Sequence, residues 1–371
     1  MALTTVRPEG LGFVNGRRNL IINGAMQVAQ RGTSFTGVGN GDSAYYLDRF
    51  KFAESGSPEG VYTISQDSNA PNGFGNSMKI DCTTAESALA ANEMTRIIYS
   101  FEGQDLQRLK KGTADAETMT FSFYIKSNLT GTAIVGFYDQ DNARYVAKSY
   151  TIDSANTWEK KILTYPADTT GAFDNDNASS MQFWMFLQAG SDVTSGTLPS
   201  TWESVTTANY AVGQTINVGS STSNEILITG VQLEVGSNAS DFEHHSFGEE
   251  LSACQRYTYV FNSQKISGEK SLCNLAKWDN GTAYGSFSFP MEMRTAPSAT
   301  IYNKTEFYVY IAGSVGQVSS SDTFGVANQT TDIGEVYIQC GEGSSGQAGF
   351  MRKAGSASGT SSGYIVLDAE L

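Results

Sequence analysis

The sequence predicts an all-β protein made of two β-sandwich domains with a short helix between them. Charged residues are only 17% of the chain, and glycine supplies 38 of its 371 residues, which is typical of many short strands joined by polar turns. Apolar and polar residues alternate in several runs, as at 119–126, which indicates strands with one buried face. The length indicates two domains.

Four regions are expected along the chain: an N-terminal arm at 1–35, a large β-sandwich at 36–243, a connecting helix within 244–260, and a smaller β-sandwich at 261–371. The arm begins with a glycine-rich stretch, so we expect it to lie extended against a partner or a neighbouring subunit. Within it, Asn23-Gly24 is typical of a tight turn, and a short strand is predicted on each side of that turn.

The large sandwich should hold a strand near 45–52 and about nine more, since runs of this spacing are typical of sandwiches. These nine are expected at 61–65, 77–82, 97–101, 119–127, 132–138, 145–152, 158–165, 181–188 and 226–235. The last of them breaks its alternation at Gly230, which predicts a bulge-like slip there. A helix of one or two turns is expected near 104–111.

The segment 226–257 changes its hydrophobic period from that of a strand to that of a helix. Ser246 and Glu249 have the spacing of a capping box, which predicts a helix start. Apolar residues then recur at helical spacing and should form the buried face: Phe247, Leu251, Cys254 and Tyr257. We interpret this helix as a packed hinge between the two β domains. The smaller sandwich should follow with strands at 258–262, 283–289, 299–302, 307–312, 334–340, 349–352 and 363–368.

The charge and the cysteines exclude several classes of protein. A formal net charge of −14 argues against nucleic-acid binding, which needs clustered Lys and Arg. The four cysteines lack the spacing of a zinc site and are expected to be reduced. The sequence has no apolar run long enough for a signal peptide or a membrane span, so we expect synthesis in the cytoplasm and no membrane partner.

Motifs that suggest catalysis or cofactors have simpler interpretations. The GxGxxG match at 341–346 leads into a glycine-rich stretch and is expected to be a flexible loop. The Gly-x-Ser-x-Gly match at 359–363 lies in a Gly/Ser stretch, where such matches arise by chance. The only histidines, His244 and His245, read as turn residues before the helix. No catalytic, cofactor-binding or metal-binding residue is predicted.

Two features are candidates for ligand contact. Oxygen-rich loops contain Asp139 and Asp141, or Asp174 and Asp176; they suit calcium, although solvated turn tips are the simpler interpretation. Aromatic side chains can stack on sugar rings, although core packing explains any single one equally well. The aromatic candidates for glycan contact are Tyr45, Tyr138, Tyr145 and Trp202, with Tyr46 and Trp184 as further members of the set.

Several separated motifs are distributed over the chain: 19–32, 46–50, 228–236 with 242–243, 249–251 with 254–257, 289–297 and 368–371. Together they resemble a family of bacteriophage appendage proteins that is common in phages of marine bacteria. It implies a non-enzymatic virion protein, usually a tail fibre or other structural protein, with a jelly roll like those of carbohydrate-binding modules. It carries no catalytic residues over to this chain.

The resemblance also implies partners and a location. Together with the extended arm and the lack of a signal peptide, it predicts a homotrimer that is made in the host cytoplasm, attached to other virion proteins through residues 1–35, and able to bind a host surface glycan. Because the chain has no internal repeat or heptad run, a compact appendage is expected instead of a long fibre. Two alternatives stay open: a capsid decoration protein without a ligand, and a glycan depolymerase on the same appendage.

Overall fold

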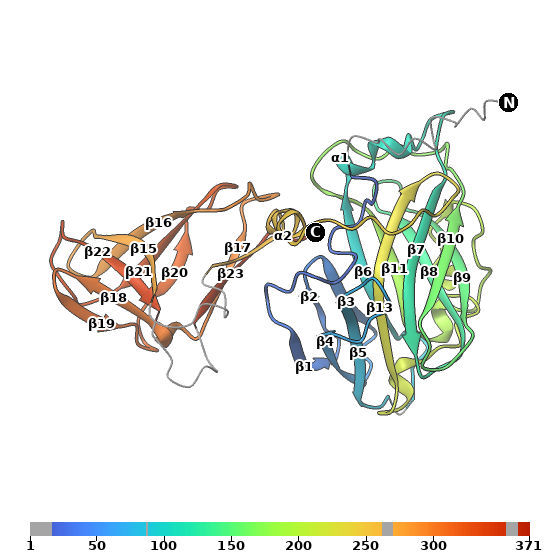
Figure 1. The fold of residues 1–371 in the computed structure, drawn as a ribbon, viewed down its shortest axis with the longest axis horizontal. Coiled ribbons are helices and arrows are strands. Elements are labelled where there is room, and N and C mark those ends of the chain that lie inside the picture. The colour runs from blue at the N-terminus through green and yellow to red at the C-terminus, as the bar shows by residue number, and fades with distance from the viewer. Residues whose placement is uncertain (1–16, 87, 262–269, 354–362) are drawn as a thin grey trace, which may run out of the picture.

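The computed structural model describes residues 17–86, 88–261, 270–353 and 363–371. These residues form two β domains with a nine-residue helix, α2 (Phe247–Gln255), between them (Figure 1). Nearly all of the regular structure is antiparallel strand, so the predicted all-β fold is confirmed. No helix in these four ranges is long and apolar enough to cross a bilayer.

The N-terminal domain is a jelly roll of two facing antiparallel sheets. The six-stranded sheet has the order β1 (Ser34–Gly39), β4 (Val61–Asp67), β5 (Ser77–Thr84), β13 (Glu225–Val235), β7 (Met119–Ser127), β10 (Glu159–Tyr165). The seven-stranded sheet has the order β12 (Glu203–Ser204), β9 (Arg144–Ile152), β8 (Gly131–Asp139), β11 (Ser179–Ala189), β6 (Met94–Glu102), β3 (Phe50–Ser55), β2 (Ser43–Leu47). The chain crosses repeatedly between the sheets, as from β6 to β7 and from β7 to β8.

Aromatic side chains from both sheets fill the space between them. Phe121 of β7 packs against Phe183 of β11 with ring centroids 5.0 Å apart, and against Phe137 of β8 at 5.6 Å. All three are at most 1% exposed. Because alternate residues of a strand point to opposite faces, the neighbours of these residues in β8 and β11 face outward.

Strand β13 contains the predicted slip at Gly230. Its pairing with β7 shifts between Thr229 and Gln232, and Gly230 has a φ of 60°. A Cβ at this position would lie 2.7 Å from the ring of Phe74, so the bulge needs glycine for its conformation and for its space.

The described part of the arm, 17–35, contradicts the predicted pair of short strands beside Asn23-Gly24. The turn exists, with Asn23 at a φ of 62°, but no strand forms on either side before β1. The main chain bonds to β13 instead: Leu20 N donates to Leu233 O, and Val231 N donates to Gly24 O. The segment therefore lies against the sandwich and not against itself.

The predicted capping box of helix α2 is confirmed, since Ser246 and Glu249 cap each other. Its predicted apolar face is only partly right. Cys254 and the following Tyr257 are buried, whereas Leu251 is half-buried and Phe247 is 50% exposed. Glu250 occupies part of the buried face instead, because its carboxylate pairs with Arg17 and accepts a hydrogen bond from Asn23 N.

The C-terminal domain is a second, smaller sandwich. A three-stranded sheet, β14 (Thr258–Phe261), β23 (Tyr364–Asp368), β17 (Ser298–Tyr302), shares one apolar core with a seven-stranded sheet. The order of the latter is β19 (Ser314–Gln317), β18 (Phe307–Ile311), β22 (Ala348–Lys353), β15 (Lys270–Lys277), β16 (Thr282–Ser288), β21 (Ile333–Gln339), β20 (Phe324–Ala327). The sequence did not predict β15, β19 and β20.

The remaining elements are single turns. The helix expected near 104–111 is α1 (Gly103–Leu106) followed by the 3₁₀ turn η2 (Gln107–Leu109). Further 3₁₀ turns are η3 (Ser191–Val193), η4 (Thr207–Asn209), η5 (Val218–Ser220) and η6 (Lys304–Glu306). Residues 341–346 connect β21 and β22 as a loop, as predicted, while most of the motif at 359–363 lies outside the described residues.

Candidate functional site

Three of the four aromatic candidates lie on the outer face of the seven-stranded sheet of the N-terminal domain. Tyr138 of β8 is the register partner of Tyr145 of β9, and Tyr45 lies on β2 at the other end of the same sheet. Trp202 is elsewhere. Its Nε1 donates to Pro166 O at 3.0 Å, and its ring packs against the edge of the core, with Lys111 Nζ 5.2 Å from the ring centroid.

Tyr145 and Tyr45 have structural contacts that limit their access to a ligand. Tyr145 is 1% exposed, and its hydroxyl donates to Tyr210 O at 2.8 Å. Its ring lies over Gly136, where a Cβ would overlap the phenol oxygen. The hydroxyl of Tyr45 donates to the main-chain oxygen of Leu371. Tyr145 therefore supports the outer face from below, and Tyr45 belongs to the contact with the C-terminus.

Trp184 of β11 is at the centre of this outer face. Its ring centroid lies 5.0 Å from that of Tyr138 and 5.1 Å from that of Tyr210, which comes from the long loop after β11. The indole is only 7% exposed, whereas both tyrosines are half-buried. The tyrosines therefore present aromatic surface to solvent, and Trp184 holds them in place.

The indole of Trp184 is itself held by a chain of side-chain hydrogen bonds. Its Nε1 donates to Gln182 Oε1 at 2.8 Å, and Gln182 Nε2 donates to the hydroxyl of Ser100 at 3.1 Å. These partners lie on β11 and β6, which are hydrogen-bonded neighbours in the sheet. The aromatic cluster is therefore preorganised, which lowers the entropy cost of binding.

Arg96 of β6 stacks on this cluster. Its guanidinium carbon lies 4.3 Å from the centroid of Trp184, within cation–π distance. Its Nη1 contacts the sulfur of Met94 at 2.8 Å, and its buried Nε has no hydrogen-bond partner. Burial lowers the pKa of Arg96 from its ordinary value to about 10.

No carboxylate of the described ranges forms an ion pair with Arg96, nor with Lys51 of the neighbouring strand β3. A partly buried cation without a counter-charge costs free energy and is typical of ligand sites. The sequence did not single out Arg96, because the predicted strand began at Ile97. A longer alternating window, starting at Met94, would have placed Arg96 on the outward face with Ile98.

A second polar cluster joins the two domains, and it is built from the motifs that carry the resemblance. Arg49 is 1% exposed and pairs with Glu370, while its Nη2 donates to Ser100 O at 2.6 Å. Its guanidinium carbon lies 3.4 Å from the ring centroid of Tyr257. Arg31 contacts Asp368 at 3.0 Å. The C-terminal motif at 368–371 is therefore seated on the N-terminal domain.

The same cluster extends to the ends of β6 and α2. Arg256 Nε and Nη2 donate to the buried carboxylate of Glu102, both at 2.7 Å, and Tyr257 OH donates to it at 2.6 Å. Burial alone would raise the pKa of Glu102, but these hydrogen bonds hold it below its ordinary value. Arg294 completes the contact, since its Nη1 donates to Asn177 O at 3.0 Å and its Nε to Ala369 O at 2.8 Å.

The two oxygen-rich loops meet, but two of their carboxylates already have partners. Asp141 Oδ2 accepts from Asp174 N at 2.9 Å, while buried Asp139 pairs with Lys111 Nζ at 2.6 Å. Within the four ranges that the structure describes, no group of three or more His, Cys, Asp or Glu side chains is arranged to hold a metal ion. His245 Nε2 lies 3.6 Å from Glu243, and His244 packs against Phe242 in the turn.

Comparisons with known proteins show likeness in fold only. No family model matches the chain, and no curated protein matches it. Among solved structures, it is similar to the enzymatically active domain of tailspike protein 4 of bacteriophage CBA120, at 12% identity and a TM-score of 0.31, covering 59% of this chain and 21% of that one. The matched part of this chain thus spans about a fifth of that solved domain.

Two carbohydrate-binding modules are similar over their whole length. One is the family 11 module from Clostridium thermocellum in complex with a β-1,3-1,4-mixed-linked tetrasaccharide, at 13% identity and a TM-score of 0.28, covering 57% of this chain and 98% of that one. The other is TmCBM61 in complex with β-1,4-galactotriose, at 7% identity and a TM-score of 0.26, covering 59% and 99%.

Proposed function

We propose that this chain is a non-enzymatic, glycan-binding structural protein of a bacteriophage virion, a compact tail-fibre or appendage subunit. The observation that carries the glycan site is the stack of Arg96 on Trp184, flanked by Tyr138 and Tyr210 on the outer face of the seven-stranded sheet. The virion role rests on the resemblance of the separated motifs.

The chemistry of this face favours an acidic sugar. The half-buried tyrosines offer aromatic surface on which a sugar ring can stack. The guanidinium of Arg96 has the fork geometry that binds a carboxylate through two hydrogen bonds, and Lys51 adds a second cation. A uronic-acid residue of a host surface polysaccharide would supply both a ring and a counter-charge.

The contact between the domains supports an appendage role. The side chains of Arg49, Glu102 and Glu370 are each at most 3% exposed and are held by ion pairs that cross from one domain to the other. Such a contact resists bending and would hold the C-terminal domain at a fixed angle to the N-terminal one. Assembly as a trimer and attachment through residues 1–35 belong to the same proposal. Light scattering that gives the mass of a monomer would contradict the trimer.

A glycan array with the full chain tests the binding site. We expect binding to glycans that contain uronic acid, with Arg96→Ala and Tyr138→Ala each weakening it at least tenfold. Tyr124→Ala and Arg108→Ala are matched controls, because Tyr124 lies half-buried on the other sheet and Arg108 donates only to Arg17 O. Equal losses in the controls, or no glycan bound, would contradict the proposed site.

Two further measurements separate the remaining alternatives. Release of reducing ends from a bound polysaccharide would identify a depolymerase instead of a binding protein. Labelling of virions with an antibody to the chain should mark an appendage in electron micrographs. Labelling over the capsid with a blank glycan array would favour the decoration protein, and no labelling at all would exclude the virion role.

A further inference from the structure

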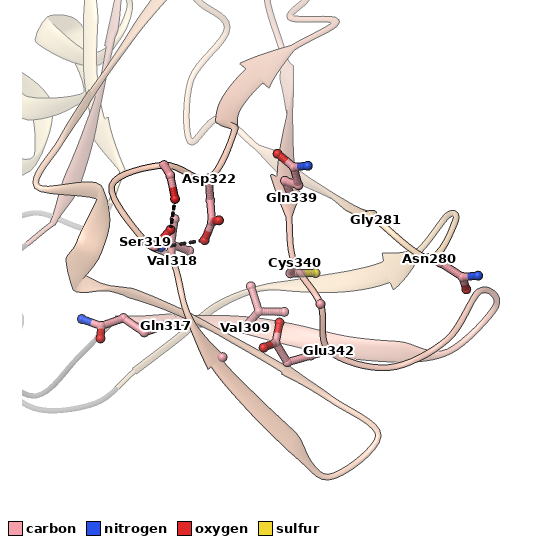
Figure 2. Close-up of a pocket in the computed structure, with 13 residues that line it drawn as sticks. Asn280, Gly281, Val309, Gln317, Val318, Ser319, Asp322, Gln339, Cys340 and Glu342 are labelled. Atoms are coloured by element: carbon pink, nitrogen blue, oxygen red, sulfur yellow. Dashed lines mark hydrogen bonds between the residues drawn. The ribbon is translucent and has the colours of Figure 1, made fainter.

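The C-terminal domain contains a polar cavity of about 660 Å³. It lies at the end that carries β18 and β19, which points away from the N-terminal sandwich (Figure 1). Pockets of ~300–1,000 Å³ are typical of small-molecule sites. Figure 2 shows that its walls come from the β15–β16 hairpin, from β19 with the loop after it, and from the chain after β21. We call this cavity the distal pocket.

The side chains of the distal pocket suit a ligand rich in hydroxyl groups. Its polar lining residues are mainly amides, hydroxyls and two carboxylates, including Asn280, Gln317, Ser319, Asp322, Gln339 and Glu342. No Lys, Arg or His side chain lines it in the described part of the chain. The lining therefore favours a neutral or positively charged ligand over an acidic one.

Glu342 gives the pocket its charge preference. Its side chain is half-buried, and no described residue forms a hydrogen bond or an ion pair with its carboxylate. The other carboxylate, Asp322, accepts from Ser319 N at 2.7 Å. Gly316 of β19 leaves the room for Glu342, because a Cβ there would lie 2.0 Å from its Oε1. An unpaired, partly buried carboxylate is stabilised by a cationic group on a ligand.

Trp278 stands on the same hairpin as Asn280 and is 75% exposed. Its main chain is fixed on both sides: Trp278 N donates to Thr282 O at 3.0 Å, and Ser345 Oγ donates to Trp278 O at 2.9 Å. A large aromatic ring exposed to water on a fixed main chain is typical of a contact surface, because its burial contributes strongly to binding.

We propose that the distal pocket binds an amino sugar with a free amine. The ammonium group lies against Glu342, the hydroxyl groups bond to the amides of Asn280 and Gln339, and the sugar chain extends over Trp278. This site goes beyond the proposed function, because it is on another domain and selects the opposite charge from the face around Arg96.

Calorimetric titration of the full chain with a β-1,4-linked glucosamine tetrasaccharide tests the distal pocket. The N-acetylated tetrasaccharide is the matched probe, since it keeps the ring and loses the charge. We expect the free amine form to bind at least tenfold more tightly than the acetylated form. Glu342→Gln should remove that difference, and Trp278→Ala should weaken both sugars at least fivefold.

Two controls make a negative result informative. Glu292→Gln changes an exposed carboxylate of the same domain outside the pocket and should leave binding unchanged. Arg96→Ala should also leave binding of the glucosamine probe unchanged. A failure of the distal-pocket proposal can therefore be distinguished from a failure of the proposed function. Three results would overturn the proposal for the distal pocket: no binding of the glucosamine probe, equal binding of both sugars, or equal loss of binding in Glu292→Gln and Glu342→Gln.

Discussion

Arg256, just after helix α2, forms two parallel hydrogen bonds, each 2.7 Å, to the buried carboxylate of Glu102 at the end of β6. Replacing Arg256 by Ala leaves Glu102 buried with only Tyr257 and Gln104 as donors. Removing one partner of a buried pair costs ~3 kcal/mol. We therefore expect the free energy of unfolding to fall by about that amount in urea denaturation.

Arg108→Ala is the control for this substitution, because Arg108 bonds only to the exposed Arg17 O. Its effect should be within ~0.5 kcal/mol. If the two variants were equally stable, the pair between Arg256 and Glu102 would not contribute to the junction.

Arg294 should fix the angle between the domains more than it stabilises either one. It donates to Asn177 O of the N-terminal domain and to Ala369 O and Glu370 O near the C-terminus. Arg294→Ala should broaden the distance distribution from small-angle scattering while each domain stays folded by circular dichroism. An unchanged distribution would show that the remaining contacts, such as Arg49 with Glu370, suffice.

Glu54 of β3 should make stability depend on pH near neutrality. Burial raises its pKa to about 7, compared with ~4.3 in an unfolded chain. Between these two pH values the folded state holds a proton that the unfolded state has lost. The contribution of Glu54 to the free energy of unfolding is therefore largest below pH ~4.3. It decreases as the pH rises to about 7.

Glu54→Gln removes this titration. Compared with the wild-type protein, its free energy of unfolding should decline less from pH 5 to pH 7.5, as measured by urea denaturation at each pH. Parallel pH profiles for the two proteins would contradict the raised pKa.

Gly230→Ala should destabilise the N-terminal sandwich by roughly 2 kcal/mol, because alanine is strained at a positive φ and its Cβ would clash with Phe74. Gly213→Ala separates the two causes, since Gly213 also has a positive φ, of 91°, but has open space around it. In thermal denaturation, Gly213→Ala should lose clearly less stability than Gly230→Ala. Equal losses would assign the whole effect to backbone strain.

Local features of the fold could be predicted from the sequence. The capping box of Ser246 and Glu249 needs residues only three positions apart, and the slip at Gly230 shows as a break in alternation. The prediction of strands beside Asn23 was wrong, because the backbone there bonds to β13, some 200 positions later. Local patterns do not reveal such a partner.

The candidate sites were harder to predict for the same reason. Arg49 and Glu370 are 321 positions apart, and their pairing exists only after both domains have folded. Arg96 looks like an ordinary strand residue until its lack of a counter-charge is known. Trp202 is of a residue type that often stacks on sugars, but its indole bonds to Pro166 O on another face. Aromatic type alone does not distinguish these environments.

The crystal structure of the full chain with the tightest uronic-acid glycan from the array tests the glycan site most directly. The sugar carboxylate should lie within hydrogen-bond distance of the Arg96 guanidinium, with a ring against Tyr138 or Tyr210. A glycan bound to the six-stranded sheet, or one that leaves Arg96 without contact, would contradict the assignment of the outer face as the binding site.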